Sequence, residues 1–488
     1  MGTQSAAGNA PLSPSVTPVK SGAPTPTTQL AISANNTNSA GSDFVNGRLT
    51  LWVNETSEDH AVALEEMVAQ FSAKQHIQVE VLLVSPQLLP QLVQQAVISG
   101  TLPDLIIHPV TYSAGWAEKG ILDPGLATEA LRIIGESTFD QEALNAVHTE
   151  NDLIFAIPTD GWRQLLIYRS DWFAERNLEP PDNYISLMAA AEALDEPEGS
   201  TSGIVVPTDA SLVSTQQVFE YLAIANDCRL VEPGGRVTVL HPYCLEALEF
   251  YRALINQFSP IGFQTDISSL NAYLAGRTGM IVTSPAALPF IAGLVDQNIP
   301  GCPECVEPGY LAKNSGYITR LYGGAASEKP SGFSELTALG FTPGANRDGA
   351  VSFADFWFNE GYSTWLAVNP ERKVPLRSGT QDQPRLFVDA WASNQLSPAG
   401  PTLEEVFGAD LVHQLIEDIA GSNRWGIAED EGILTSTLYQ DLLISPLLQD
   451  MLSGYFTSSQ TIIELYQVVV NAIPHYNFPI EIVSTPEP

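Results

Sequence analysis

The chain has few basic residues for its size. Its 488 residues include 21 Lys and Arg against 56 Asp and Glu, which gives a formal net charge of −35 at pH 7. Binding to nucleic acid depends on basic patches that neutralise phosphates, so this composition excludes nucleic acid as an expected partner. The same charge is repelled by an anionic membrane surface and favours neutral or cationic ligands over anionic ones.

Long apolar runs are also lacking. No stretch reaches the roughly 18 apolar residues of a membrane span, and Met1 leads into polar residues rather than into a secretory signal. Two explanations stay open: the sequence starts downstream of a signal, or the protein is cytosolic. Residues 1–46 favour the first, because their Ser, Thr and Pro content predicts a disordered tether. We therefore expect an extracytoplasmic protein, at the cell surface or periplasmic and lipid-anchored, although this segment holds no lipid-attachment cysteine.

Cysteine is scarce, with four residues in the chain. An even number in an exported protein predicts two disulfides, Cys228–Cys244 and Cys302–Cys305. Two alternatives stay open for Cys302-Pro-Glu-Cys305, namely a redox-active pair and half of a zinc site. Its position in the Pro- and Gly-rich stretch 300–309, without a second paired motif elsewhere, favours structural disulfides over both.

Common catalytic motifs are missing as well. The chain has no G-x-S-x-G nucleophile elbow, no H-E-x-x-H zinc motif and no phosphate-binding loop. A glycosidase with two carboxylates stays formally open, but with 56 acidic residues such a pair can always be proposed, so the signal carries almost no information. We expect no enzyme activity, no cofactor and no metal.

What is present is a regular alternation of strand and helix patterns. The length exceeds what one hydrophobic core usually holds, so we expect at least two lobes. Alternating apolar residues predict strands, and apolar residues at helical spacing predict helices between them, which indicates an α/β lobe with a mainly parallel sheet. The expected strands are 48–53, 77–84, 102–108, 280–283 and the pair 155–158 and 165–168 around a turn; the expected helices include 64–71, 90–99, 216–224, 242–255, 268–275, 285–294 and 461–473.

Five short motifs follow one another along the chain. They are Leu49–Val53 with a helix to Phe71 and strand Gln78–Val81, Gly100–Ile107 with Trp116–Leu122, Phe155–Gly161 with Leu166–Phe173, Ala275–Val282, and Tyr322–Gly324 with Val374–Arg377. In this order they resemble family 1 extracellular solute-binding proteins, the group that includes maltose-binding and multiple-sugar-binding proteins. Arg169 departs from the motif, which has Asn after the tyrosine.

The resemblance implies a two-lobed, type II periplasmic-binding-protein-like α/β fold with a helical C-terminal region. We expect lobe 1 to contain residues 47–157 and 278–322, and lobe 2 to contain residues 158–277 and 323–488. It also implies the function: a monomer that closes on a small solute, expected to be a sugar, and delivers it to the permease subunits of an ABC importer.

In such a fold the ligand lies between the lobes, near the carboxyl ends of the strands. A sugar is held by an aromatic platform and by polar groups around its hydroxyl rim, whereas a compact cation is held by the same groups through cation–π contacts and a carboxylate. We expect the platform from Trp52, Tyr112, Trp162 and Tyr322, the acceptors from Glu55 and Asp160, and further contacts from Asn54, His108, Thr159, Gly161 and Ser284.

Several of these residues also have a structural interpretation. Trp52 fits a strand that packs on both faces, and Asp160-Gly161 fits a simple turn. His108 fits a hydrogen-bonded residue at the end of a strand, and Glu55 fits a favourable charge near a helix N-terminus. Two other functions stay open beside the transport receptor: a secreted hydrolase acting on glycans, and a surface sensor or adhesion subunit with the same two-lobed shape.

Overall fold

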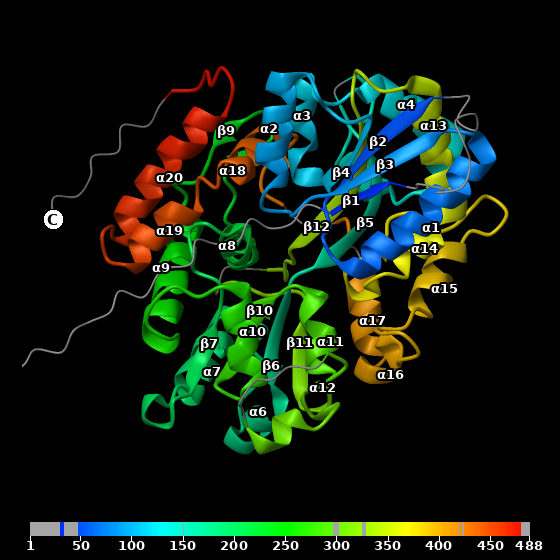
Figure 1. Ribbon diagram of the computed structural model, residues 1–488. Helices are drawn as coiled ribbons and strands as arrows, with labels where there is room; N and C mark the ends of the chain where they lie inside the picture. The colour runs from blue at the N-terminus through cyan, green and yellow to red at the C-terminus, as the bar shows by residue number, and fades with distance from the viewer. Residues whose placement is uncertain are drawn as a thin grey trace, which may run out of the picture.

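The computed structural model describes residues 30–33, 47–149, 151–295, 302–324, 328–417, 419–421 and 424–479. Figure 1 shows two lobes, each with its own β-sheet and helices packed around it. We call the lobe with the seven-stranded sheet the first lobe and the lobe with the four-stranded sheet the second lobe. The α/β class and the two-lobed organisation expected from the sequence are confirmed.

The sheet of the first lobe has the strand order β1-β3-β2-β4-β12-β5-β13. Strands β2, β3 and β4 are parallel, and β1, β12 and β13 pair antiparallel with their neighbours. The strands are β1 (Leu30–Ser33), β2 (Arg48–Val53), β3 (Gln78–Leu83), β4 (Leu105–Pro109), β5 (Ile157–Arg163), β12 (Ser334–Phe341) and β13 (Val374–Pro375).

Local sequence explains why this sheet starts as it does. Leu49, Leu51 and Val53 alternate along β2 and are fully buried. Helix α1 (Glu58–Gln75) follows, with the Ser57 side chain accepting a hydrogen bond at its N-cap and an apolar stripe that includes Phe71 packed into the core.

The sheet of the second lobe has the order β11-β6-β10-β7, with β10 parallel to β7 and antiparallel to β6. Its strands are β6 (Leu165–Arg169), β7 (Ser202–Val205), β10 (Thr278–Thr283) and β11 (Ser315–Ile318). A separate two-stranded ribbon joins β8 (Val231–Glu232) and β9 (Arg236–Val237).

Helices cover both sheets and connect their strands. Near the first sheet are α1, α2 (Leu89–Ser99), α3 (Ser113–Glu118), α4 (Pro124–Ile134), α5 (Gln141–Asn145), α13 (Arg347–Phe356), α14 (Tyr362–Leu366) and α15 (Leu386–Ala392). Near the second are α6 (Ser170–Arg176), α7 (Tyr184–Leu194), α8 (Val213–Ala225), α9 (Pro242–Phe258), α10 (Asp266–Leu274), α11 (Leu288–Ile291) and α12 (Tyr310–Lys313). The C-terminal helices are α16 (Leu403–Phe407), α17 (Ala409–Ile416), α18 (Gly432–Gln440), α19 (Ser445–Leu452) and α20 (Ser458–Ala472).

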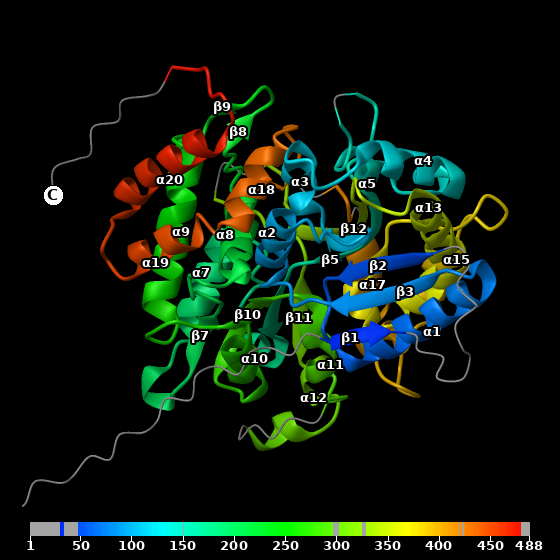
Figure 2. The same ribbon diagram turned by 45° about the horizontal axis from the view of Figure 1, so that its top comes forward.

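The C-terminal helices connect the lobes. Helix α18 packs against α3 of the first lobe, whereas α19 and α20 pack against α8 and α9 of the second. Figures 1 and 2 agree on this arrangement, with α18 beside α3 and α20 beside α9. The chain also crosses between the lobes from β5 to β6, where only Gln164 separates the strands, and returns between β11 and β12. Several crossings therefore hold the two lobes together.

Two expected boundaries differ from the structure. Residues 278–322 were expected in the lobe of 47–157, but β10 and β11 pair with β6 in the second sheet. Residues 323–488 were expected in the other lobe, but β12 and β13 pair with β4 and β5 in the first sheet. The reason is physical: an apolar strand pattern fixes which residues form a strand, and distant partners decide which sheet it joins.

Two further expectations need correction. The tether 1–46 was expected to lack structure throughout, yet residues 30–33 form β1, which extends the first sheet by pairing with β3; the rest of that segment lies outside the described residues. Strands 155–158 and 165–168 were expected around a turn, yet β5 runs to Arg163 and the chain enters β6 of the other sheet directly.

Both expected disulfides are present. Cys228–Cys244 joins the end of α8 to the start of α9 across 16 positions of sequence, and Cys302–Cys305 closes a short loop before α12. Among the residues that the structure describes, no helix combines the length and the apolar character required to cross a membrane.

Candidate ligand-binding site between the lobes

The residues expected at the site do not form one cluster. Glu55 pairs with Lys373, and Asp160 bonds to Trp365 of α14. The Lys373 ammonium lies 3.9 Å from the Trp365 ring, so both acids belong to one group in the first lobe. Tyr112 lies elsewhere, against α18, where its carbonyl accepts the Ser436 hydroxyl at 3.3 Å. The structure therefore divides the expected site between two locations.

Glu55 belongs to a compact charged group in the first lobe. Its carboxylate lies 3.1 Å from the Lys373 ammonium, 3.5 Å from the Arg372 guanidinium and 3.8 Å from His60 Nε2. Burial alone would raise the pKa of Glu55, but Lys373 and Arg372 outweigh it and lower the pKa to about 2. Burial also lowers the pKa of His60 to about 3, so this ring is neutral at pH 7. Glu55 is thus an ionised carboxylate already paired within the protein.

Thr159 and Asp160 are buried in the same region. The Asp160 carboxylate accepts the indole N–H of Trp365 at 2.8 Å, and burial raises the pKa of Asp160 above its usual value. Thr159 donates its hydroxyl to the Thr337 carbonyl at 3.1 Å, and its own carbonyl accepts the Tyr362 hydroxyl. Both side chains have their polar atoms occupied inside the first lobe.

His108 and Tyr112 pack around one tryptophan. Trp116 lies 4.9 Å from the His108 ring and is stacked with Tyr112 at 5.3 Å. His108 is fully buried, and this burial lowers its pKa to about 4, although its Nδ1 is bonded to the Pro109 carbonyl. His108 therefore lies in the core, against the Trp116 ring on which Tyr112 stacks.

Gly161 and Trp162 lie on β5, next to β12. A Cβ on Gly161 would come within 2.7 Å of the Leu336 side chain and 3.1 Å of the Glu335 carbonyl, so close strand packing requires glycine here. Trp162 is paired in register with Glu335, is half-buried, and has its ring 6.0 Å from Phe333. Trp162 therefore presents an aromatic surface beside Glu335.

The four other expected residues are more scattered. Trp52 is half-buried on β2, and Asn54 has a buried amide oxygen with no hydrogen-bond partner among the described residues. Ser284 directly precedes the short helix η4 (Pro285–Ala287), which packs against residues of η7 (Pro370–Arg372) in the first lobe. Tyr322 is 39% exposed and is held to the second lobe by its backbone N–H, which donates to the Asp182 carbonyl at 2.8 Å.

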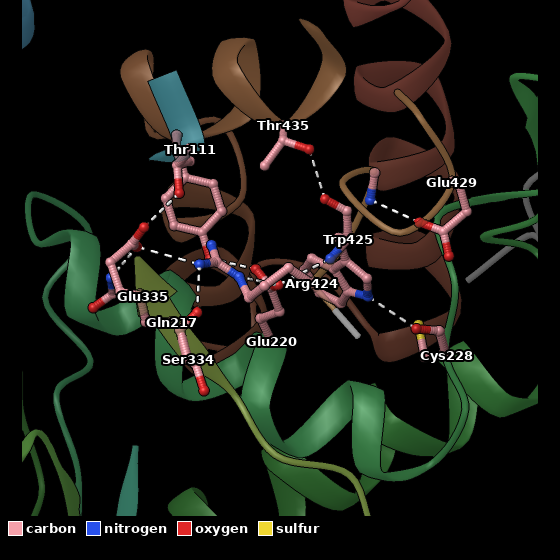
Figure 3. Close-up of polar contacts among 12 residues, drawn as sticks. Thr111, Gln217, Glu220, Cys228, Ser334, Glu335, Arg424, Trp425, Glu429 and Thr435 are labelled. Carbon is pink, nitrogen blue, oxygen red and sulfur yellow. Dashed lines mark hydrogen bonds and ion pairs between the residues drawn. The ribbon is translucent and has the colours of Figure 1, made fainter. Parts of the chain in front are cut away.

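A buried polar network links the two lobes, and Figure 3 shows its central residues. Glu335 of β12 accepts the Thr111 hydroxyl at 2.7 Å from the first lobe and the Gln217 amide at 3.2 Å from the second. Glu220, one turn further along α8, accepts the Tyr439 hydroxyl of α18. We call Thr111, Gln217, Glu220, Glu335, Arg424 and Tyr439 the interlobe network.

Arg424 lies at the centre of this network. Its Nε donates to Glu220 at 2.7 Å, and its Nη1 donates to the Ser334 carbonyl at 3.0 Å and to Glu335 at 3.3 Å. Burial by itself lowers the pKa of Arg424, but the carboxylates and the Tyr439 hydroxyl outweigh it and hold that pKa above its ordinary value. Burial and the neighbouring Glu220 also raise the pKa of Tyr439, which stays protonated. One guanidinium therefore joins carboxylates from both lobes.

Part of this network has a usable signal in the amino-acid pattern. Glu220 stands alone in the apolar run 218–225, and Glu335 stands alone in a strand of apolar and small residues, and a lone acid in a buried run usually has a specific partner. Arg424 had no such signal, because it lies in a polar stretch between helices. The network was therefore missed.

Space at the interface is limited. A cavity of about 20 Å³ lies inside it, lined in part by Val110, Ser334, Glu335 and Arg424. A larger open depression of about 900 Å³ lies on the outside of the second lobe, between Ser202, Asn256 and Asn271. In the described part of the chain no three His, Cys, Asp or Glu side chains gather in a way that holds a metal ion.

Two sheets joined by several crossings, with polar side chains from both lobes meeting between them, define a two-lobed binding protein. The chain belongs to the bacterial extracellular solute-binding protein family, whose model matches residues 54–363. This confirms the resemblance found in the sequence, and it identifies the protein as a member of a family of extracytoplasmic binding proteins.

Individual relatives agree with this assignment. "Putative ABC transporter periplasmic-binding protein YcjN" of Escherichia coli (strain K12) is 25% identical over 338 residues, which cover 66% of this chain and 73% of that protein. An ABC transporter solute-binding protein from Thermotoga lettingae has the same fold, with a TM-score of 0.67 at 18% identity over 88% of this chain and 100% of that chain. The GacH receptor of Streptomyces glaucescens has a TM-score of 0.66 at 16% identity over 88% and 99% of the respective chains.

Proposed function

We propose that the chain is the extracytoplasmic substrate-binding component of an ABC importer, and that it holds a small polyhydroxylated solute between its lobes. The main support for this proposal is the interlobe network, in which Thr111 and Gln217 donate to the same Glu335 carboxylate from opposite lobes. A solute that enters there meets polar groups from both lobes, so its binding and the closure of the lobes are coupled.

The chemistry at this position suits a sugar or a sugar alcohol. Hydroxyl, amide and carboxylate groups complement a rim of hydroxyls, and the half-buried face of Trp162 complements apolar C–H groups. Of the residues expected from the sequence, Tyr112 and Trp162 fit this site best. Structures of similar proteins support the choice: the Thermotoga lettingae protein is bound with alpha-D-tagatose, and the GacH receptor was studied in complex with acarbose.

The remaining parts of the proposal follow from the family. Solute delivered to an importer must reach permease subunits, so these are the proposed protein partner, with the chain itself acting as a monomer attached by a lipid anchor. The proposed function includes no catalysis. A product released from glycans by the purified chain, and lost on changing one interlobe carboxylate, would favour a hydrolase instead.

A thermal-shift screen of sugars, oligosaccharides and sugar alcohols tests the proposal. A solute at about 100 times its Kd stabilises the folded state by roughly 2.7 kcal/mol, which is a measurable rise in Tm. Trp162→Ala should abolish the shift of the best solute. Trp172→Ala is the matched control, because Trp172 is also half-buried but stacks on Arg169 in the second lobe, 4.4 Å from its guanidinium. Equal shifts in both variants would contradict the site.

A further inference from the structure

The guanidinium of Arg424 is held in the way that a bound cation is held. Its central carbon lies 4.1 Å from the ring of Phe333 and 5.0 Å from that of Tyr439, in addition to its bonds to Glu220 and Glu335. Two carboxylates with two aromatic rings form a favourable environment for a positive charge in a buried space. This environment stabilises a positive charge, whether the charge belongs to Arg424 or to a bound molecule.

The charges at this position do not balance with Arg424 alone. Glu220 and Glu335 are both buried, and within the interlobe network Arg424 is the only cation, so one net negative charge is left over. Neutral hydrogen-bond donors also stabilise the two carboxylates. Tyr439 and the Trp425 backbone N–H donate to Glu220, while Thr111 and Gln217 donate to Glu335. If Arg424 left and a neutral molecule took its place, two buried carboxylates would lose their counter-charge, which is strongly unfavourable.

Hydrogen-bonding capacity is also left unused. Among the described residues, Arg424 Nη2 and the Ser334 hydroxyl have no hydrogen-bond partner, although both residues are at least nine-tenths buried. Both residues line the cavity of about 20 Å³, which has room for roughly one water molecule. The position therefore offers polar atoms beyond those that the Arg424 side chain satisfies.

Arg424 lies at the start of a turn that is attached to the second lobe. In residues 424–431, the Trp425 indole donates to the Cys228 carbonyl at 2.9 Å, and Glu429 pairs with Arg229 at 3.0 Å. From this base the Arg424 side chain reaches the Ser334 carbonyl and Glu335 of the first lobe. The chain's own cation thus bridges the lobes at the position where a solute would bridge them, as Figure 3 illustrates.

We propose that Arg424 is an intramolecular occupant of the interlobe site and that the solute which replaces it carries a positive charge. This rests on the function proposed above and narrows it: the solute is a polyhydroxylated molecule with an ammonium or guanidinium group, such as an amino sugar. Its cation takes the place between Glu220 and Glu335, and its hydroxyls meet Thr111, Gln217 and the Ser334 hydroxyl.

The test compares cationic and neutral probes by isothermal titration at constant ionic strength. The probes are methylguanidinium chloride, glucosamine at a mildly acidic pH where its ammonium is charged, and glucose. In Arg424→Met, which removes the internal competitor, the affinities for methylguanidinium and glucosamine should rise by at least about tenfold over the unchanged protein. Arg385→Met is the matched control, because Arg385 is an exposed residue paired with Asp389, and it should bind all probes like the unchanged protein.

Two results would overturn the inference. One is an equal response of Arg424→Met to glucosamine and glucose, and the other is loss of all binding in that variant, which would make Arg424 part of the site. If Arg424→Met does not fold, the unchanged protein decides, since it should bind glucosamine more tightly than glucose. Tight binding of glucose with no preference for the cation would leave the proposed function standing and this inference wrong, whereas solute binding that ignores Trp162→Ala would refute the proposed site itself.

Discussion

The Arg424 Nε lies 2.7 Å from a carboxylate oxygen of Glu220, although 204 positions of sequence separate the two residues. Both side chains are buried, and the pair joins the C-terminal turn to helix α8. A buried charge of this kind is stable only while its partner is present. The interlobe network should therefore respond to mutation as a unit.

Removing one partner of this pair should destabilise the protein severely. Arg424→Met leaves Glu220 without its strongest counter-charge and should lower the free energy of unfolding by about 3–5 kcal/mol. The double variant Glu220→Leu/Arg424→Met should lose less than the sum of the two single changes, because neither charge is then left alone. Urea denaturation of the four proteins measures this coupling; strictly additive losses would contradict a linked pair.

Glu55 should make the protein sensitive to acid. Its pKa is lowered to about 2 in the folded protein from an ordinary value of 4.5, so the stabilisation is present above pH 4.5 and is lost as the pH falls toward 2. At neutral pH this lowered pKa of Glu55 stabilises the folded state by about 3 kcal/mol. Glu55→Gln should lower Tm at pH 7, and the Tm of this variant should fall less steeply than that of the unchanged protein as the pH drops below 4.5. Glu65→Gln, an exposed change on α1, should leave the curve unaltered.

Glu371 should have the opposite pH dependence. Burial raises its pKa from 4.5 to about 7, so the folded state holds a proton that the unfolded state has lost. The stabilisation of the folded state by this raised pKa is fully present below pH 4.5 and is lost as the pH rises through 7. Glu371→Gln, which mimics the protonated form, should therefore raise Tm at pH 8 and change it little at pH 4.5. A lower Tm at both pH values would show that the carboxyl has another role.

The two disulfides should differ in their contribution to stability. In the chain-entropy model a bridge across 16 positions stabilises by about 3 kcal/mol, whereas one across 3 positions contributes roughly half of that. Cys228→Ser/Cys244→Ser should therefore lower Tm more than Cys302→Ser/Cys305→Ser, and the two double variants serve as controls for each other. The reverse order would mean that the short loop near α12 is the more important link.

Much of the first lobe could be predicted from the sequence. The patterns at 48–53, 77–84 and 102–108 became β2, β3 and β4. Strands β2 and β3 bury alternate residues, whereas β4 is buried along nearly its whole length, and both kinds of apolar pattern are visible in the local sequence. Assignment of later strands to a lobe failed, since β10 and β12 are both apolar, and their partners are far away along the chain.

The site was less predictable, for a related reason. Positions at strand ends and at the lobe crossing led to Tyr112 and Trp162, which lie near Glu335 of the interlobe network. The same reasoning also selected Asp160 and Glu55, whose polar atoms are satisfied within the first lobe by Trp365 and Lys373. Pairings such as Arg424 with Glu335, 89 positions apart, depend on the tertiary fold and have no local pattern.

The most direct test of a solute held between the lobes is the affinity of the best-binding solute for Thr111→Val and Gln217→Ala, measured by isothermal titration. Each change removes one polar group from a different lobe, and the loss of one hydrogen bond costs about 1–3 kcal/mol. We expect weaker binding in both variants and unchanged binding in Gln70→Ala, an exposed glutamine on α1. Full affinity in both Thr111→Val and Gln217→Ala would contradict a solute site between the lobes.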